Sequence, residues 1–234
     1  MEAYDNLFYK EMSKSSMSSA RFLVPFLMEN LEFSSVIDIG CGDGLFVSQF
    51  IQHGIPNVKG IEGKWILDSL DKSAATWLEI ADLTEELIYD SRFDLAICLE
   101  VAEHLEEEYA DTLIRNLTSA SDIVFFSAAI PGQGGTNHVN LQYPLYWAKK
   151  FAKHGYFVAW DPRKSLWGNK EVAPWYQQNC LVYKKCEDVN KDLVTPPSLK
   201  HPEIFPELQS TWYKVRNVAI RVLKKFIRTF SGKN

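Results

Sequence analysis

The stretch "VIDIGCGDGLFV", residues 36–47, decides the fold, because an apolar run that carries an acid leads into three closely spaced glycines and then into more apolar residues. A β-branched apolar run that meets glycines and then a second apolar run is typical of a strand that turns tightly into a helix. In an open parallel sheet, ligands bind beyond the carboxyl ends of the strands, and the first strand usually leads there. The stretch therefore predicts a ligand-binding turn.

The spacing and charge of this turn narrow the kind of ligand. The glycines are Gly40, Gly42 and Gly44. Leu45 stands where the dinucleotide fingerprint, Gly-x-Gly-x-x-Gly, has its third glycine. Asp38 precedes the turn and Asp43 lies within it, and two carboxylates repel a pyrophosphate but attract an ammonium and a sulfonium. The pattern favours a cationic nucleoside over a dinucleotide.

Alternation of strands and helices extends along most of the chain. Apolar runs rich in β-branched residues recur at 36–40, 58–62, 77–81, 93–99, 122–128, 156–160 and 179–184. Segments with helical spacing lie between most of them, at 16–31, 44–53, 64–72, 107–119 and 143–153. This order predicts an α/β fold with a mainly parallel seven-stranded sheet between two helical layers. The last two strands lack a helix between them, which predicts a C-terminal antiparallel hairpin with a long connection.

Composition separates a large first part of the chain from a basic end. We expect a domain over 1–185 and a Pro-rich linker over 186–206. Residues 207–234 have helical spacing with an apolar stripe and a basic face, so this amphipathic helix would dock on the domain, join a second subunit as a homodimer contact, or lie peripherally on a membrane.

Charge and composition exclude several classes of protein. The 234 residues carry a net charge of −5, and seven of the 25 basic residues but one of the 30 acidic residues fall in 207–234, which leaves the first 206 residues at −11. This excess of negative charge argues against nucleic acid as a partner, because it would repel the phosphate backbone. The N-terminal residues lack the order of a signal peptide and no apolar stretch is long enough to cross a bilayer, which predicts a cytoplasmic protein. The cysteines are interpreted as reduced structural thiols: Cys41, Cys98, Cys180 and Cys186.

Two further acids follow predicted strands. Glu62 ends the second strand in "VKGIEG", where an acid can accept hydrogen bonds from both hydroxyls of a ribose. Asp82 ends the third strand in "EIADL", in reach of an exocyclic amine. The alternative is that both acids only cap the ends of strands.

With these residues the chain resembles the Rossmann-like, class I S-adenosylmethionine-dependent methyltransferases. "VIDIGCGDG" looks like their first motif, Glu62 like their ribose acid, "ADL" like their adenine contact and "FDLAICLEVAEHL" like their fourth-strand motif. The features cover residues 36–105 in the expected order. The resemblance implies a Rossmann-like three-layer sandwich, S-adenosyl-L-methionine as cofactor and methyl transfer as activity. The cofactor-binding residues it implies are Asp38, Gly40, Cys41, Gly42, Gly44, Glu62, Gly63, Asp82, Leu83, Glu100 and Val101.

Methyl transfer to a hydroxyl needs a base, and histidine is the usual base near neutral pH. His53 and His154 precede glycines at the ends of predicted helices and His201 lies in the linker, so these three are interpreted as structural or solvated. His104 would lie just past the fourth strand, where a catalytic role and a helix-cap role both stay open. His138, in the loop after the fifth strand, is the preferred catalytic base.

The loop that carries His138 is the predicted acceptor site. Residues 130–156, "IPGQGGTNHVNLQYPLYWAKKFAKHGY", begin glycine-rich and then gather amides and aromatic rings, which suits a polyhydroxylated ligand. The predicted substrate-binding residues are Asn140, Gln142 and Tyr143. Trp147 and Phe151 are interpreted as the buried stripe of the next helix. The pattern also resembles methyltransferases associated with glycan or natural-product assembly.

Two aromatic or serine-rich segments have open roles. Trp167, Trp175 and Tyr176 would either wall the acceptor pocket or close the core. "KSSMSSARFLVPFL" resembles the segment that folds over the cofactor in related enzymes, which implies that 1–33 form an N-terminal cap over the cofactor and substrate. The alternative is that its serines cap a helix: Ser15, Ser16 and Ser18.

Three hypotheses for function follow. The first is O-methylation of a sugar hydroxyl in a glycan, a nucleotide sugar or a related polyhydroxylated metabolite, with a histidine base. The second is N-methylation of a small amine or a protein, and the third is a catalytically inactive scaffold that binds the cofactor. No metal ligand set is predicted, because no cluster in the sequence compels one, but the many acids near the site leave a metal requirement open.

Overall fold

The computed structural model describes residues 2–67, 76–186 and 196–205, with side chains described from residue 14 onward. The chain divides into two compact units, Met1–Leu199 and Lys200–Asn234. In the second unit the structure describes a short turn, in which the N–H groups of Ile204 and Phe205 both donate to the carbonyl of His201. The predicted basic helix over 207–234 and its membrane or subunit contacts lie outside the described residues.

The first unit is built on one seven-stranded sheet with the order β3-β2-β1-β4-β5-β7-β6. The strands are β1 Ser35–Ile39, β2 Asn57–Glu62, β3 Leu78–Ile80, β4 Leu95–Leu99, β5 Ile123–Ser127, β6 Tyr156–Trp160 and β7 Leu181–Lys185. Strands β1 to β5 pair in parallel, and β7 lies antiparallel to both β5 and β6. The predicted parallel sheet with its C-terminal antiparallel hairpin is confirmed.

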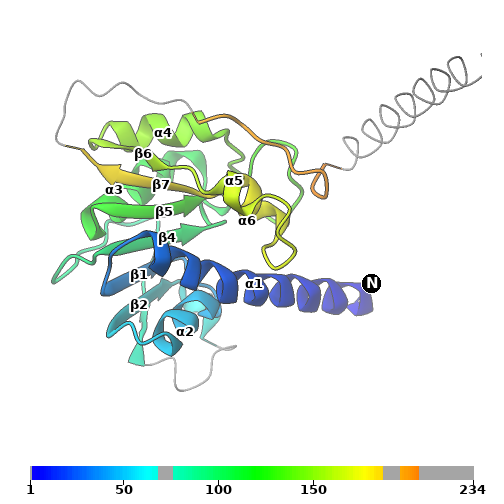
Figure 1. The fold of residues 1–234 in the computed structure, drawn as a ribbon, viewed down its shortest axis with the longest axis horizontal. Helices are drawn as coiled ribbons and strands as arrows, with labels where there is room; N and C mark the ends of the chain where they lie inside the picture. The colour runs from blue at the N-terminus through cyan, green and yellow to red at the C-terminus, as the bar shows by residue number, and fades with distance from the viewer. Residues whose placement is uncertain (1, 68–75, 187–195, 206–234) are drawn as a thin grey trace, which may run out of the picture. The chain divides into compact units, whose positions relative to one another are not determined.

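Helices cover both faces of this sheet (Figure 1). Side chains of α1 Glu2–Asn30, α2 Leu45–Gln52, α5 Arg163–Leu166 and α6 Pro174–Asn179 share one apolar cluster with the sheet. Side chains of α3 Ala110–Ala120 and α4 Pro144–Ala152 share the cluster on the opposite face. Short 3-10 helices follow β2 at η1 Lys64–Ile66 and follow β4 at η3 Ala102–His104 and η4 Glu107–Tyr109. No helix among the described residues is both long and apolar enough to span a bilayer.

Two expectations about helices are wrong. The connection between β6 and β7 contains α5 and α6, which have four and six residues and are too short to show a helical period in the sequence. Helix α1 begins at Glu2 rather than near residue 16, so Ser15, Ser16 and Ser18 lie inside the helix and cannot cap its start. Ser19 instead joins elements, since its hydroxyl donates to the carbonyl of Ser15 and accepts the N–H of Ala173.

A buried arginine fixes the position of α6. The Arg163 guanidinium has no exposed surface and forms a two-pronged ion pair with Asp161, with N···O distances of 2.7 and 2.6 Å. Its remaining donors reach the carbonyls of Gln178 in α6 and Pro197 beyond β7. A buried guanidinium is stable only when its donors are satisfied in this way. Arg163 therefore ties α6 and the chain after β7 to the end of β6.

The strand order positions the site. Strand β1 lies between β2 and β4, and the chain leaves β1 toward β2 on one side and reaches β4 and β5 on the other. Ligands of open α/β sheets bind at such a switch point, beyond the carboxyl ends of the strands. The glycine turn after β1, Glu62 at the end of β2 and Glu100 after β4 meet at this edge.

Candidate functional site

The three glycines after β1 have different neighbours. All have positive φ angles, 83° at Gly40, 54° at Gly42 and 76° at Gly44, which favour glycine. A Cβ atom on Gly40 would lie 2.5 Å from the Val101 side chain, and one on Gly44 would lie 2.3 Å from the Trp77 ring. A Cβ on Gly42 would have no atom within 4 Å. Side chains of the protein pack against Gly40 and Gly44, whereas Gly42 leaves open space for a ligand.

Glu62 reaches from β2 to this turn. One carboxylate oxygen accepts the N–H of Gly42 at 2.7 Å and the other accepts the N–H of Gly63 at 2.8 Å. Each oxygen keeps a further lone pair, so the group can still accept hydroxyl donors. The Trp65 indole lies against Gly63 and is 68% exposed, which leaves a ring face beside the acid.

Negative charge is concentrated under the turn. Asp38 is buried, and its pKa is raised by burial and further by the charges of Glu62 and Asp43. Burial and then Asp38 raise the pKa of the Cys41 thiol, which is therefore protonated at neutral pH. A cation placed beside Gly42 would relieve the repulsion between these carboxylates. The donor set therefore fits a cationic ligand.

The acid after β3 is part of a local turn. Asp82 is exposed, and one of its oxygens accepts both the hydroxyl and the N–H of Thr84, at 2.7 and 2.9 Å; these bonds lower its pKa. The register of β2 and β3 places this turn next to Glu62. The Leu83 side chain is buried in the core. Asp82 thus caps the end of β3, and a role for Asp82 and Leu83 in cofactor binding stays a prediction.

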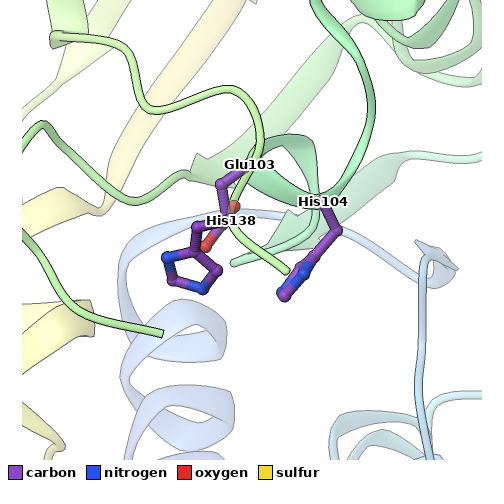
Figure 2. A group of neighbouring side chains, drawn as sticks. All are labelled: Glu103, His104 and His138. Atoms are coloured by element: carbon purple, nitrogen blue, oxygen red, sulfur yellow. The ribbon is translucent and has the colours of Figure 1, made fainter. Parts of the chain in front are cut away.

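The two candidate histidines lie together, with a carboxylate that the sequence did not single out (Figure 2). Glu103 and His104 belong to η3 after β4, whereas His138 comes from the loop after β5. Each side chain offers one possible ligand atom within 4.8 Å of the others, and the imidazole centroids are 4.8 Å apart. The loop is held there because the N–H groups of Val139 and Asn140 donate to the carbonyl of Glu103, at 2.8 and 3.1 Å.

Burial controls the charges in this cluster. It lowers the pKa of His104, and burial followed by the neighbouring His104 lowers the pKa of His138, so both rings are neutral at pH 7 and keep a lone pair. The Glu103 carboxyl group is buried against the Glu100 carboxyl group, and burial followed by the charge of Glu100 raises its pKa. The cluster can accept a proton, or it can hold a divalent cation that balances the buried carboxylate.

The predicted acceptor residues follow His138. Asn140 is buried and accepts a hydrogen bond from the Gln142 side chain at 3.1 Å, while Tyr143 is exposed at the start of α4. Trp147 and Phe151 are buried, as predicted.

The later aromatic side chains divide between core and surface. Tyr176 packs edge-on against Phe46 in the core, Trp175 packs against the same cluster, and Trp167 is exposed.

Several residues near the site escaped the sequence analysis. Glu103 occurs within "LEVAEH", but its burial beside His138 depends on the path of the loop. Gln133, Gln178 and Asn179 bond to one another or to Glu100. The one available signal was the amide run "QQN" at 177–179, which is unusual for a buried helix end.

A cavity of about 520 Å³ lies along α1 and includes none of the predicted site residues. It is lined by Lys14, Met17, Ser18, Arg21, Phe22 and Glu171. The predicted capping role of residues 1–33 therefore stays a prediction.

The sheet order, the glycine turn after β1 and the acid at the end of β2 define the class: the chain has the Rossmann-like fold of the class I S-adenosylmethionine-dependent methyltransferases. Among solved structures, it is similar to magnesium protoporphyrin IX methyltransferase from Synechocystis PCC 6803 with bound S-adenosylhomocysteine, with a TM-score of 0.56 and 19% identity over 74% of this chain and 84% of that one. The same enzyme has been solved with bound S-adenosylmethionine. DesVI of Streptomyces venezuelae gives a TM-score of 0.59 at 12% identity, over 79% of this chain and 98% of that one.

Among curated proteins, the chain is similar to ubiquinone biosynthesis O-methyltransferases. That of Rickettsia bellii is 31% identical over 91 residues, which are 35% of this chain and 37% of that protein. That of Rickettsia felis is 34% identical over 79 residues, 30% of this chain and 31% of that protein. The chain thus matches about a third of the length of these relatives. No protein-family model matches it.

Proposed function

We propose that this chain is an S-adenosylmethionine-dependent O-methyltransferase that methylates a hydroxyl group of a small molecule, with Glu103, His104 and His138 as the centre that activates the acceptor. The convergence of these three side chains just beyond Val101, which packs on Gly40 of the cofactor turn, carries the proposal. The names of the curated relatives support O-methylation as the reaction.

The residues of the turn fit the cofactor. When bound, S-adenosylmethionine supplies a sulfonium methyl group to a nucleophile. The open flank of Gly42 admits the ligand, the carboxylates of Asp38 and Glu62 favour its positive charge, and the remaining lone pairs of Glu62 suit ribose hydroxyls. The exposed Trp65 ring offers a stacking face for the base.

The cluster acts on the acceptor in one of two ways. As the first candidate, Glu103, His104 and His138 hold a divalent cation, which would lower the pKa of a hydroxyl bound to it. The buried carboxyl groups of Glu103 and Glu100 repel each other, and a cation would relieve this repulsion, which favours this candidate. As the second candidate, the neutral His138 ring takes the hydroxyl proton directly, and its Nδ1 atom, which has no hydrogen-bond partner among the described residues, favours that role.

Transfer from labelled S-adenosylmethionine to a panel of small phenols, nucleotide sugars, glycolipids and amines tests the proposal. Nucleotide sugars are included because Asn140, Gln142 and Tyr143 are the predicted contacts of a polyhydroxylated acceptor. Amines are included to test N-methylation. We expect a hydroxyl acceptor to be methylated, EDTA to abolish turnover, and Mn²⁺ or Mg²⁺ to restore it. His138→Ala should lower kcat by about 10²- to 10⁴-fold. His53→Ala is the matched control, because His53 caps α2 by contacting the carbonyl of Gln49.

The outcomes separate the candidates. Turnover that resists EDTA but is lost in His138→Ala selects the metal-free base. Full turnover in both His104→Ala and His138→Ala removes the cluster from the reaction. Transfer to amines alone replaces O-methylation by N-methylation, and cofactor binding without transfer to any acceptor supports the scaffold hypothesis.

A further inference from the structure

Three residues from Glu103, the carboxylate of Glu100 bonds to a group of buried side-chain amides. This group is here called the amide cluster: Gln133, Gln178 and Asn179. Gln133 belongs to the loop after β5, and the other two end α6. All three are buried, and they surround the carboxylate of Glu100 at the end of β4. Glu100 has a φ angle of 56°, a conformation that costs a residue with a side chain free energy and persists only where its surroundings hold it.

The hydrogen bonds of the amide cluster fix the orientation of each amide. The Gln133 amide donates to one oxygen of Glu100 at 2.8 Å, so its own oxygen faces away and accepts from Gln178 and Asn179, at 2.9 and 3.0 Å. Asn179 also donates to the other oxygen of Glu100 at 3.0 Å. Exchanging N and O in the Gln133 amide would break all three of its bonds. A connected buried network of this kind is rigid and specific.

The main chain of the same residue contacts the candidate active site. The carbonyl of Gln133 faces the His138 ring and favours its protonated form. Nδ1 of His138 is buried and has no hydrogen-bond partner among the described residues. A Cβ on Gly135 would lie 2.0 Å from this ring, so the loop between the two residues wraps it closely.

We propose that Gln133 is a positioning residue: by bonding to Glu100 and α6 it fixes the loop that holds the His138 ring beside Glu103 and His104. The value of this ring position to catalysis rests on the proposed function, whereas the ring position itself does not. Residues that orient the ring of a histidine ligand typically change metal affinity by about 10- to 100-fold when they are lost.

The test compares Gln133→Met with Gln177→Met. Gln177 is also a buried amide of α6, but it bonds to Gly168, Asn169 and Val172 and not to Glu100. In Gln133→Met we expect Mn²⁺ affinity and kcat to fall by about 10- to 100-fold with KM for S-adenosylmethionine unchanged. In Gln177→Met both should stay at the wild-type level, even though stability falls. Equal losses in the two variants would reduce Gln133 to a packing role and overturn the inference.

A double variant that exchanges the side chains of residues 100 and 133 tests whether restoring the hydrogen bonds restores function. In Glu100→Gln combined with Gln133→Glu, the amide and the carboxylate trade places, and every donor of the network still meets an acceptor. We expect each single variant to lose metal affinity and kcat and the double variant to recover most of both. A double variant no better than the worse single one would contradict a positioning role through this network.

Nitrogen chemical shifts of the His138 ring, measured by NMR, test the inference without relying on methyl transfer or metal binding. We expect the same ring shifts in the wild type and in Gln177→Met, and changed or broadened shifts in Gln133→Met, because the loop no longer holds the ring in one place beside Glu103 and His104. Unchanged shifts in Gln133→Met would refute the inference whatever the activity. A wild type that binds no Mn²⁺ and transfers no methyl group, but shows these shifts, would refute the proposed function and leave the positioning of His138 standing.

Discussion

Single residues in the loop after β5 decide whether the two histidines meet. The His138 ring faces the carbonyl of Gln133, and the residues that follow it are held by the carbonyl of Glu103. A Cβ on Gly135 would lie 2.0 Å from the ring, so the chain passes closely against the ring at this glycine. The position of the His138 ring therefore requires glycine at residue 135, because a side-chain methyl group there would overlap the ring.

Two neighbouring glycines test this dependence. Gly135→Ala would place a Cβ 2.0 Å from the His138 ring, whereas a Cβ on Gly134 would have no atom within 4 Å. Neither glycine is among those with a positive φ angle, so backbone strain does not confuse the comparison. We expect Gly135→Ala to displace the ring and to lower Mn²⁺ affinity and kcat by at least about tenfold. Gly134→Ala should match the wild type, and equal effects of the two changes would contradict the geometry.

At the scale of elements, buried strands were predictable and short helices were not. The strand runs 36–40 and 93–99 are apolar apart from Asp38 and Asp94, because both faces of a parallel sheet are covered. Helices α5 and α6 are too short to show a period. The glycine turn after β1 and its proximity to Glu62 were predictable, because the ends of adjacent strands carry these residues. The meeting of Glu103 and His138 was not, because main-chain hydrogen bonds that no side-chain pattern encodes set the path of the loop.

The starts of β1 and β4 are joined by one carboxylate. Asp94 accepts hydrogen bonds from the N–H and hydroxyl of Ser34 and from the N–H of Ser35, at 2.8, 2.8 and 3.0 Å. These bonds lower its pKa, the Ser34 N–H first. Because the pKa is lower in the folded state, the stabilisation is present above the unfolded pKa of about 3.9 and is lost as the pH falls through the folded value.

Asp94→Asn removes this charge and keeps the shape. We expect it to lower the free energy of unfolding at pH 7 by about 1 kcal/mol, a small value because the group is exposed to solvent. The difference from wild type should shrink below about pH 4, where Asp94 itself takes up a proton. Urea denaturation at pH 7 and at pH 3 measures both effects, with the exposed Asp90→Asn as control. A loss that is the same at the two pH values would show that the charge of Asp94 is not the source.

At the scale of the whole molecule, one edge of the sheet collects every group that the proposed reaction needs. Strand order places the turn after β1 between Glu62 on β2 and the segment after β4, and the loop after β5 adds His138. The carboxylates of Asp38, Asp43 and Glu62 lie close together at the glycine turn after β1. They belong to a part of the chain, the first 206 residues, that carries a net charge of −11. The unliganded fold therefore holds repulsion that a cationic ligand would relieve.

Binding of the cofactor should consequently stabilise the entire fold. A ligand at 100 times its Kd adds about 2.7 kcal/mol to the free energy of unfolding, which in a chain of this size raises Tm by about 5–10 °C. We expect S-adenosylmethionine and S-adenosylhomocysteine to produce such shifts in thermal unfolding. Glu62→Gln should remove most of the shift, because a neutral amide accepts ribose hydroxyls less strongly and donates where Glu62 accepts the N–H groups of Gly42 and Gly63. Glu79→Gln breaks an exposed ion pair with Lys59 and should leave the shift intact. A full shift in Glu62→Gln would mean that this acid does not hold the ribose.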